Sequence, residues 1–238
     1  MGSISIRKYI QWLPKEASEP TSTLVLTSPE RRYVDIRVLL PINEDDAQKI
    51  LPLERLDWAI AGFSSSTARD DGQGGQIFHS NWRHWIDSRH KDAEAASDEG
   101  DNHPRPDGLT LEKGSMVNPA TGRDTAYEEL WYDPDPKITP PEEKVVSLVL
   151  MWEESEVRRG MVVRVGEYCQ GFVRDGDELA AERWAWREGG GGWERVVKIG
   201  SERELPCAEV LNGTRALKLG DEILRGKESW KVVEIRWD

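Results

Sequence analysis

The sequence predicts an all-β protein that consists of two antiparallel meander β-barrels with one or two short helices. Apolar and polar residues alternate with a period of two over many segments, which is typical of strands with one buried face. The 238 residues include 11 Trp but 3 Phe, and large indole rings suit barrel interiors and interfaces. Four prolines within residues 133–144 interrupt the strand pattern, since proline cannot continue a strand ladder. We therefore predict one barrel over residues 1–138 and a second over residues 139–238.

The first predicted barrel begins with regular strand patterns. Residues 3–12 and 33–40 each carry an apolar face opposite a polar face, as a half-buried strand does. Asn43 is a favourable N-cap and acidic residues follow it, so a short helix is predicted over residues 43–51.

The segment from residue 76 to residue 90 holds three of the four histidines of the chain. On a strand, alternate side chains face opposite sides, so His79 and His84 point apart, and so do His84 and Asp87. A helix does not bring the two histidines together either. No zinc-ligand spacing is present, and we predict no metal site and no cofactor. The segment is interpreted as an aromatic-rich strand in which His84 is partly buried and hydrogen-bonded.

Residues 91–107 form an acidic, proline-containing stretch without periodicity, for which we predict a solvated and mobile loop. Ser97 in this stretch is a candidate phosphorylation site, because casein-kinase-type enzymes favour its acidic neighbours Asp98 and Glu99. An acidic chain also contains such serines by chance. A hairpin that turns at Asn118–Gly122 is predicted next.

The second predicted barrel is also rich in strand patterns. Residues 144–152 alternate clearly, and residues 183–199 predict a hairpin whose tip is the glycine run 189–192. Residues 219–237 predict a further hairpin that turns near Gly226.

Composition excludes several classes of function. The net charge of −12 repels phosphate backbones, so we expect no nucleic-acid partner. The chain has no apolar run of membrane-spanning length, and we expect no direct membrane insertion. Cys169 and Cys207 show no spacing pattern, which indicates a reduced cytosolic or nuclear protein with structural thiols. No nucleophile elbow or phosphate-binding loop is present, so no catalytic residue is predicted.

Several segments, taken together and in order, resemble a known family. They are LDWAIAGF (56–63), NWRHWIDS (81–88), TAYEELW (125–131), VVSLVLMW (145–152) and RGMVVRVGEYCQGFV (159–173). From about Ile4 to Ile235 the chain is similar to the fungal Hri-one proteins, a family named for interaction with a yeast casein kinase I. The resemblance implies two lipocalin-like barrels, a cytoplasmic and nuclear distribution, and association with casein kinase I and with the endoplasmic-reticulum translocation machinery. The family has no established enzyme activity, so no catalytic residue is carried over.

Three functions fit these observations. The first is a non-enzymatic interaction protein that presents an acidic surface to casein kinase I or another basic partner. The second is a binder of a small hydrophobic ligand inside a barrel, although the same rings could simply fill the barrels. The third is a lipocalin-fold isomerase or cyclase, which would need His84 and Asp87 or Glu129 in one cavity. The candidate ligand-lining residues are Trp58, Trp82 and Trp85 in the first barrel and Trp152, Trp184 and Trp186 in the second.

Overall fold

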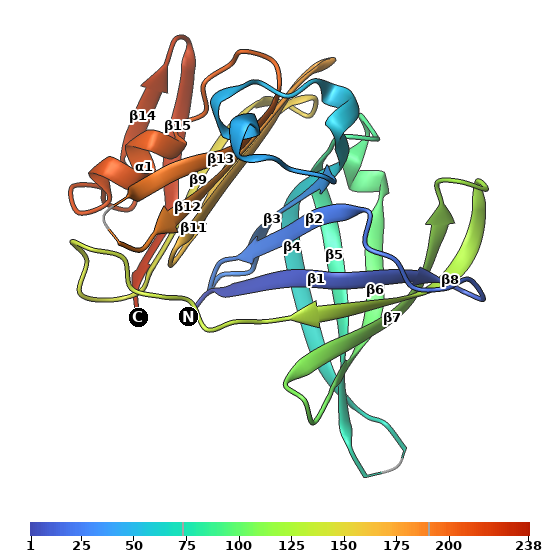
Figure 1. Ribbon diagram of the computed structural model, residues 1–238. Coiled ribbons are helices and arrows are strands. Elements are labelled where there is room, and N and C mark those ends of the chain that lie inside the picture. The colour runs from blue at the N-terminus through green and yellow to red at the C-terminus, as the bar shows by residue number, and fades with distance from the viewer. Residues whose placement is uncertain (73, 190) are drawn as a thin grey trace.

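The computed structural model describes residues 1–72, 74–189 and 191–238. Within these ranges, two antiparallel β units lie side by side, accompanied by three short 3-10 helices and one α-helix (Figure 1). The all-β class and the antiparallel meander predicted from the sequence are confirmed.

The first unit is a closed eight-stranded barrel. Each strand pairs with the next one along the chain, and the last strand pairs with the first to close the ring. Closure pairs β1 with β8, the two strands that would be the free edges of an open sheet. The strands are β1 (Ser3–Trp12), β2 (Thr21–Thr27), β3 (Arg32–Leu39), β4 (Leu56–Asp70), β5 (Gln76–Asp87), β6 (Ser97–Pro104), β7 (Leu109–Asn118) and β8 (Arg123–Tyr132), with 3-10 helices η1 (Glu44–Gln48), η2 (Leu53–Arg55) and η3 (Ala93–Ala95) between them.

The second unit is a curled seven-stranded sheet with the order β13-β12-β11-β10-β9-β15-β14. It is not closed into a barrel, and β13 and β14 are its edge strands. A helix covers one of its faces: Cys207, Val210 and Leu211 of α1 pack into the apolar cluster there. Its elements are β9 (Val146–Ser155), β10 (Arg158–Val165), β11 (Tyr168–Asp175), β12 (Glu178–Arg187), β13 (Gly192–Gly200), α1 (Cys207–Gly213), β14 (Glu222–Arg225) and β15 (Glu228–Trp237).

The other face of this sheet packs against the outside of the barrel (Figure 1). Leu26 and Ile36 of the barrel share one apolar cluster with Val163 and Phe172 of the sheet, and all four are fully buried. Burial of each such side chain contributes about 1.5–3 kcal/mol. The apolar residues that alternate along these barrel strands therefore lie on the outer face of the barrel. The polar residues between them point into its interior.

Polar side chains of the sheet also reach the barrel backbone. The Gln170 amide donates hydrogen bonds to the carbonyl oxygens of Leu24 and Val34, at 2.9 and 3.0 Å. The Arg183 guanidinium donates to the carbonyl oxygen of Ile36 at 2.6 Å. These charged and amide donors are buried, so the bonds are stronger than exposed ones. The two units thus form one continuous packed body.

The predicted loop over residues 91–107 is wrong over residues 93–95, which form η3, and over residues 97–104. Residues 97–104 form β6, which pairs with β5 on one side and β7 on the other and so completes the barrel. The sequence pattern did not predict this strand, because neither of its faces contacts an apolar core. Asp98 lines the polar interior of the barrel, and Glu99 is exposed to solvent.

The remaining expectations concern the connections. The helix predicted over 43–51 is the 3-10 helix η1. The proline-rich segment joins β8 to β9 without forming a strand. The hairpin turn predicted at 189–192 joins β12 to β13, and its residue Gly190 lies outside the described residues.

Candidate functional site: the polar interior of the barrel

A cavity of about 110 Å³ lies inside the eight-stranded barrel. Every strand of the barrel contributes at least one side chain to its wall, because alternate residues of each strand point inward. The wall consists of Ser5, Val25, Thr27, Tyr33, Asp35, Arg37, Ile60, Trp82, Asp98, Asn102, Thr110, Glu112, Met116, Tyr127, Glu129, Trp131 and Asp133.

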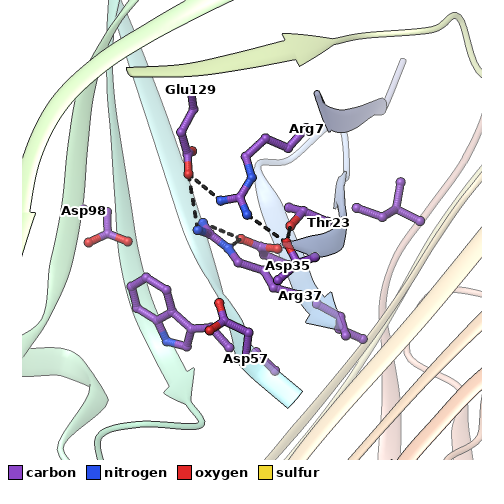
Figure 2. A network of polar contacts seen from close by, with 12 residues as sticks. Arg7, Thr23, Asp35, Arg37, Asp57, Asp98 and Glu129 are labelled. Atoms are coloured by element: carbon purple, nitrogen blue, oxygen red, sulfur yellow. Dashed lines mark hydrogen bonds and ion pairs between the residues drawn. The ribbon is translucent and has the colours of Figure 1, made fainter. Parts of the chain in front are cut away.

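Two arginines and two carboxylates form a charged network at one side of the cavity (Figure 2). Arg7 donates to Glu129 Oε1 at 2.5 Å, and Arg37 donates to the same oxygen at 3.4 Å. Arg37 Nε also donates to Asp35 Oδ2 at 2.9 Å. A further donor of Arg7 reaches Thr21 Oγ1 at 2.8 Å. Strands β1, β2, β3 and β8 are thereby tied together across the interior.

Burial and neighbouring charges shift the pKa values of this network in a consistent way. Burial by itself lowers the pKa of Arg37, but Asp35 and Glu129 raise it above its ordinary value. The pKa of Asp35 is raised, because burial outweighs the opposing effect of Arg37. The arginines of the network are therefore charged, and burial disfavours the ionised form of Asp35.

Glu112 stands apart from the arginines. Burial, followed by repulsion from Glu129, raises the pKa of Glu112 to about 8. The Tyr127 hydroxyl donates to Glu112 Oε1 at 2.8 Å, and Glu112 forms no ion pair with another described residue. Glu112 is therefore a neutral carboxylic acid at pH 7, placed in the cavity wall.

Three buried polar groups of the cavity wall are left without a hydrogen-bond partner among the described residues. They are the hydroxyl of Tyr33, Oδ1 of Asp35 and Nε1 of Trp131. Tyr33 and Asp35 are 2% and 4% exposed. An unpaired buried polar group costs about 1–3 kcal/mol, so such groups generally face a water molecule or a ligand. The cavity is thus polar and incompletely satisfied.

His84 and Asp87 contact each other, contrary to the expectation from strict alternation. Trp85 is an extra residue in β5, because the pairing of β5 with β4 shifts there, and such a β-bulge reverses the alternation beyond it. Trp85 and Ile86 consequently both pack toward the second unit. His84 Nδ1 then lies 2.9 Å from Asp87 Oδ2, inside the barrel.

The environment of His84 makes it a cation. Burial lowers its pKa, but the hydrogen bonds to Asp87 and Asp98 outweigh burial and raise the pKa to about 9. Its Nε2 lies 3.4 Å from Asp98 Oδ2. The Trp58 indole donates to the other oxygen of Asp87 at 2.9 Å. His84 of β5 therefore lies between two carboxylates, Asp87 of the same strand and Asp98 of β6, and so links the two strands.

The six candidate ligand-lining tryptophans are scattered. Trp82 lines the cavity, and Trp58 lines a separate hollow at which Arg37 and Arg89 also lie. Trp85 packs between the two units. In the second unit Trp152 packs against Trp230, the Trp184 indole donates to Glu182, and Trp186 meets Trp193 edge to face.

Ser97 is the first residue of β6 and pairs with Arg83. Its side chain lies outside the described part of the structure. The sequence-based candidates also omit most of the polar groups in the cavity wall, such as Asp35, Arg37 and Glu112. The signal for Asp35 and Arg37 was present, since both alternate with apolar residues in β3.

Two further findings concern the described residues as a set. No three of their His, Cys, Asp or Glu side chains gather in a way that could hold a metal ion. None of the described helices is long and apolar enough to cross a membrane.

The fold and the cavity define a class: an all-β protein with a closed eight-stranded antiparallel barrel, a second curled sheet and a small polar cavity. Residues 3–234 match the family described as Protein HRI1, and the chain belongs to this family. A crystal structure of an uncharacterized protein from Saccharomyces cerevisiae has the same fold, with a TM-score of 0.74, 21% sequence identity and 99% of each chain covered. No curated protein matches the chain.

Proposed function

We propose that this protein binds a small polar molecule in the cavity of its eight-stranded barrel. The observation that carries the proposal is a cavity lined by three residues that each hold a buried polar atom without a hydrogen-bond partner among the described residues: Tyr33 Oη, Asp35 Oδ1 and Trp131 Nε1. A ligand that supplies their missing hydrogen bonds removes the cost of leaving them unpaired. The polar wall favours such a ligand over the hydrophobic one expected from the tryptophan content.

Non-enzymatic binding is part of this proposal. A general base must be able to accept a proton at the working pH, whereas the raised pKa of His84 favours the protonated ring. Its Nδ1 is hydrogen-bonded to Asp87, and its Nε2 lies 3.4 Å from the charged partner Asp98 without a hydrogen bond among the described residues. The carboxylates nearest to it are its own partners, Asp87 and Asp98. This arrangement supports a structural role for the His84 pair.

Native mass spectrometry of the gently purified protein tests ligand binding. We expect an added mass that is lost on mild denaturation. The variant Val25→Trp, which enlarges a side chain of the cavity wall, is the matched control and should carry no added mass. Absence of added mass in the wild type, together with failure of every probe molecule described below to bind, would contradict the proposal.

Interaction with casein kinase I is a second proposal, and the net charge of −12 supports it. An acidic protein attracts a basic partner through long-range forces that salt screens. Glu99 and Asp101 of β6 have side chains 66% and 40% exposed. We expect salt-sensitive binding of the purified kinase that weakens when both residues are replaced by lysine. An association with the translocation machinery and a cytoplasmic and nuclear distribution likewise stand as proposals from the resemblance.

A further inference from the structure

Acidic side chains outnumber basic ones in the wall of the barrel cavity. Among the described residues of the wall, Arg37 is the single arginine and there is no lysine. Arg37 pairs with Asp35 and Glu129, Glu129 also pairs with Arg7, and Asp98 lies beside His84. Glu112 is thus the carboxyl group whose ionisation responds to a ligand: a bound cation favours its ionised form, and a bound anion opposes it. The acidic residues of the wall are Asp35, Asp98, Glu112, Glu129 and Asp133.

We propose that the ligand of this cavity is a small organic cation with a primary ammonium group, held between Asp35 and Glu112. This inference rests on the proposed function and specifies the chemical class of its ligand.

The unpaired acceptors favour a primary ammonium group. Asp35 Oδ1 is a buried carboxylate oxygen that no described donor reaches, and an –NH₃⁺ group carries three donors. The hydroxyl of Tyr33, also unpaired and in the same wall, can accept a second of them. A quaternary ammonium ion has no N–H and would leave both oxygens unsatisfied.

Aromatic rings and a free indole complete the recognition. Tyr33, Trp82, Tyr127 and Trp131 belong to the cavity wall, and the faces of such rings attract cations. The indole N–H of Trp131 has no acceptor among the described residues, so it can donate to a hydroxyl group of the ligand. The cavity of about 110 Å³ is smaller than the engineered cavity of about 150 Å³ that takes up benzene. The ligand is therefore a short amino alcohol or an amine of similar size.

Ionisation of Glu112 can compensate the charge of a bound cation, because the cavity then loses one proton as it gains the cation. The charged and titratable groups that face it are Tyr127 and Glu129 on β8, Asp98 on β6 and Arg37 on β3. Its proton is retained because burial and Glu129 raise its pKa to about 8. An ammonium ion beside Glu112 favours the ionised carboxylate. Entry of the cation therefore releases the proton to solvent, and the net charge of the cavity is unchanged.

A titration with probes that differ mainly in charge tests the inference. Ethanolammonium, propan-1-ol and propionate are of similar size, and tetramethylammonium is a cation without N–H. Binding is followed by NMR through the indole N–H signal of Trp131. We expect ethanolammonium to bind roughly tenfold more tightly than the other three, because it alone forms charge-assisted hydrogen bonds with the wall.

Calorimetry in phosphate and in MOPS buffer at pH 7 measures the protons released, because the two buffers differ in their heat of ionisation and neither contains a primary ammonium group. We expect release of about one proton per ethanolammonium bound. Glu112→Gln should bind without proton release, and Asp35→Asn should weaken binding roughly tenfold. Glu194→Gln, the same kind of change on the exposed surface of the second unit, is the control and should match the wild type.

The outcomes separate the inference from the proposed function. Binding of propanol or propionate without ethanolammonium would overturn the ammonium inference and leave a ligand-binding barrel. Equal binding of tetramethylammonium would overturn the role of the unpaired acceptors. Failure of all four probes, with no added mass on the purified protein, would overturn both proposals. If Asp35→Asn does not fold because Arg37 loses a partner, Glu112→Gln and the proton count still decide the question.

Discussion

Glu112 and His84 both hold a proton at neutral pH, for opposite physical reasons. Glu112 is protonated because burial and the charge of Glu129 disfavour its ionised form. His84 is protonated because Asp87 and Asp98 stabilise its cation despite burial. Titration of either group as the pH rises lowers the free energy of unfolding, because both folded-state pKa values are raised. Titration of Glu112 also enters the ligand exchange proposed above.

The His84 pair predicts a loss of stability at alkaline pH. The folded-state pKa of about 9 lies above the ordinary value of 6.5, so the stabilisation is complete below pH 6.5 and is lost as the pH rises through 9. We expect the free energy of unfolding attributable to His84 to fall by about 3 kcal/mol over this interval. Urea denaturation of the wild type and of His84→Gln between pH 6 and pH 10 measures the difference.

The informative quantity is the difference between the two proteins, because Glu112 also titrates in this interval. His103→Gln, a histidine substitution that leaves the His84 pair intact, should keep the pH profile of the wild type. A His84→Gln profile parallel to that of the wild type would contradict the assignment.

At the scale of elements, the sequence predicted those strands that have one apolar face. β1 and β3 were recognised because Leu, Ile and Val alternate there with polar residues. β6 was missed because the interior of the barrel is polar, so neither of its faces needs apolar residues. The contact between His84 and Asp87 was missed because a bulge at Trp85 shifts the strand period. Bulges are set by the pairing partner, which a single segment does not display.

The pairing of β6 with β7 places two glycines opposite each other, Gly100 and Gly114. They leave room for the hydrogen bond between Glu112 and Tyr127. A Cβ atom at Gly114 would lie 2.5 Å from the Tyr127 hydroxyl oxygen, and one at Gly100 would lie 2.9 Å from Glu112 Oε1. Small residues at this point are therefore a requirement of the cavity wall.

We expect Gly114→Ala to lower the free energy of unfolding by about 1–3 kcal/mol through overpacking. Because the added methyl group displaces the Tyr127 ring, the Tyr127 NMR signals should shift as well. Thermal unfolding and NMR spectra of the variant measure both effects. Gly213→Ala at the end of α1, where a Cβ would have no neighbour within 4 Å, is the control and should be at least as stable as the wild type. Equal behaviour of the two variants would refute the spatial argument.

For the whole molecule, the interface between the two units is part of the hydrophobic core. One apolar cluster contains residues of both units, including Ile4, Val34, Ala61, Val149 and Ile199. A barrel separated from the sheet would expose this outer face to water. An exposed apolar patch of that kind promotes association.

We therefore expect residues 1–138, expressed alone, to aggregate or to remain poorly folded, as judged by size-exclusion chromatography and NMR. The control is the full chain with a protease site inserted between residues 138 and 139. After cleavage, its two halves should stay together as one particle, because the interface persists. A folded, monomeric fragment 1–138 would show that the units are independent, and only then would partner binding be tested on separate halves.

Arg183 donates one hydrogen bond to the Ser22 hydroxyl. The other four hydrogen bonds from Gln170 and Arg183 to the barrel reach main-chain oxygen atoms of β2 and β3. Every amino acid offers the same carbonyl oxygen, so these bonds depend on the path of the strands and not on their side chains. The barrel surface can therefore change its side chains during evolution while this part of the joint is preserved. Exchanging whole units between distant relatives becomes a practical route to chimaeric proteins, in which the cavity of one is carried on the sheet of another.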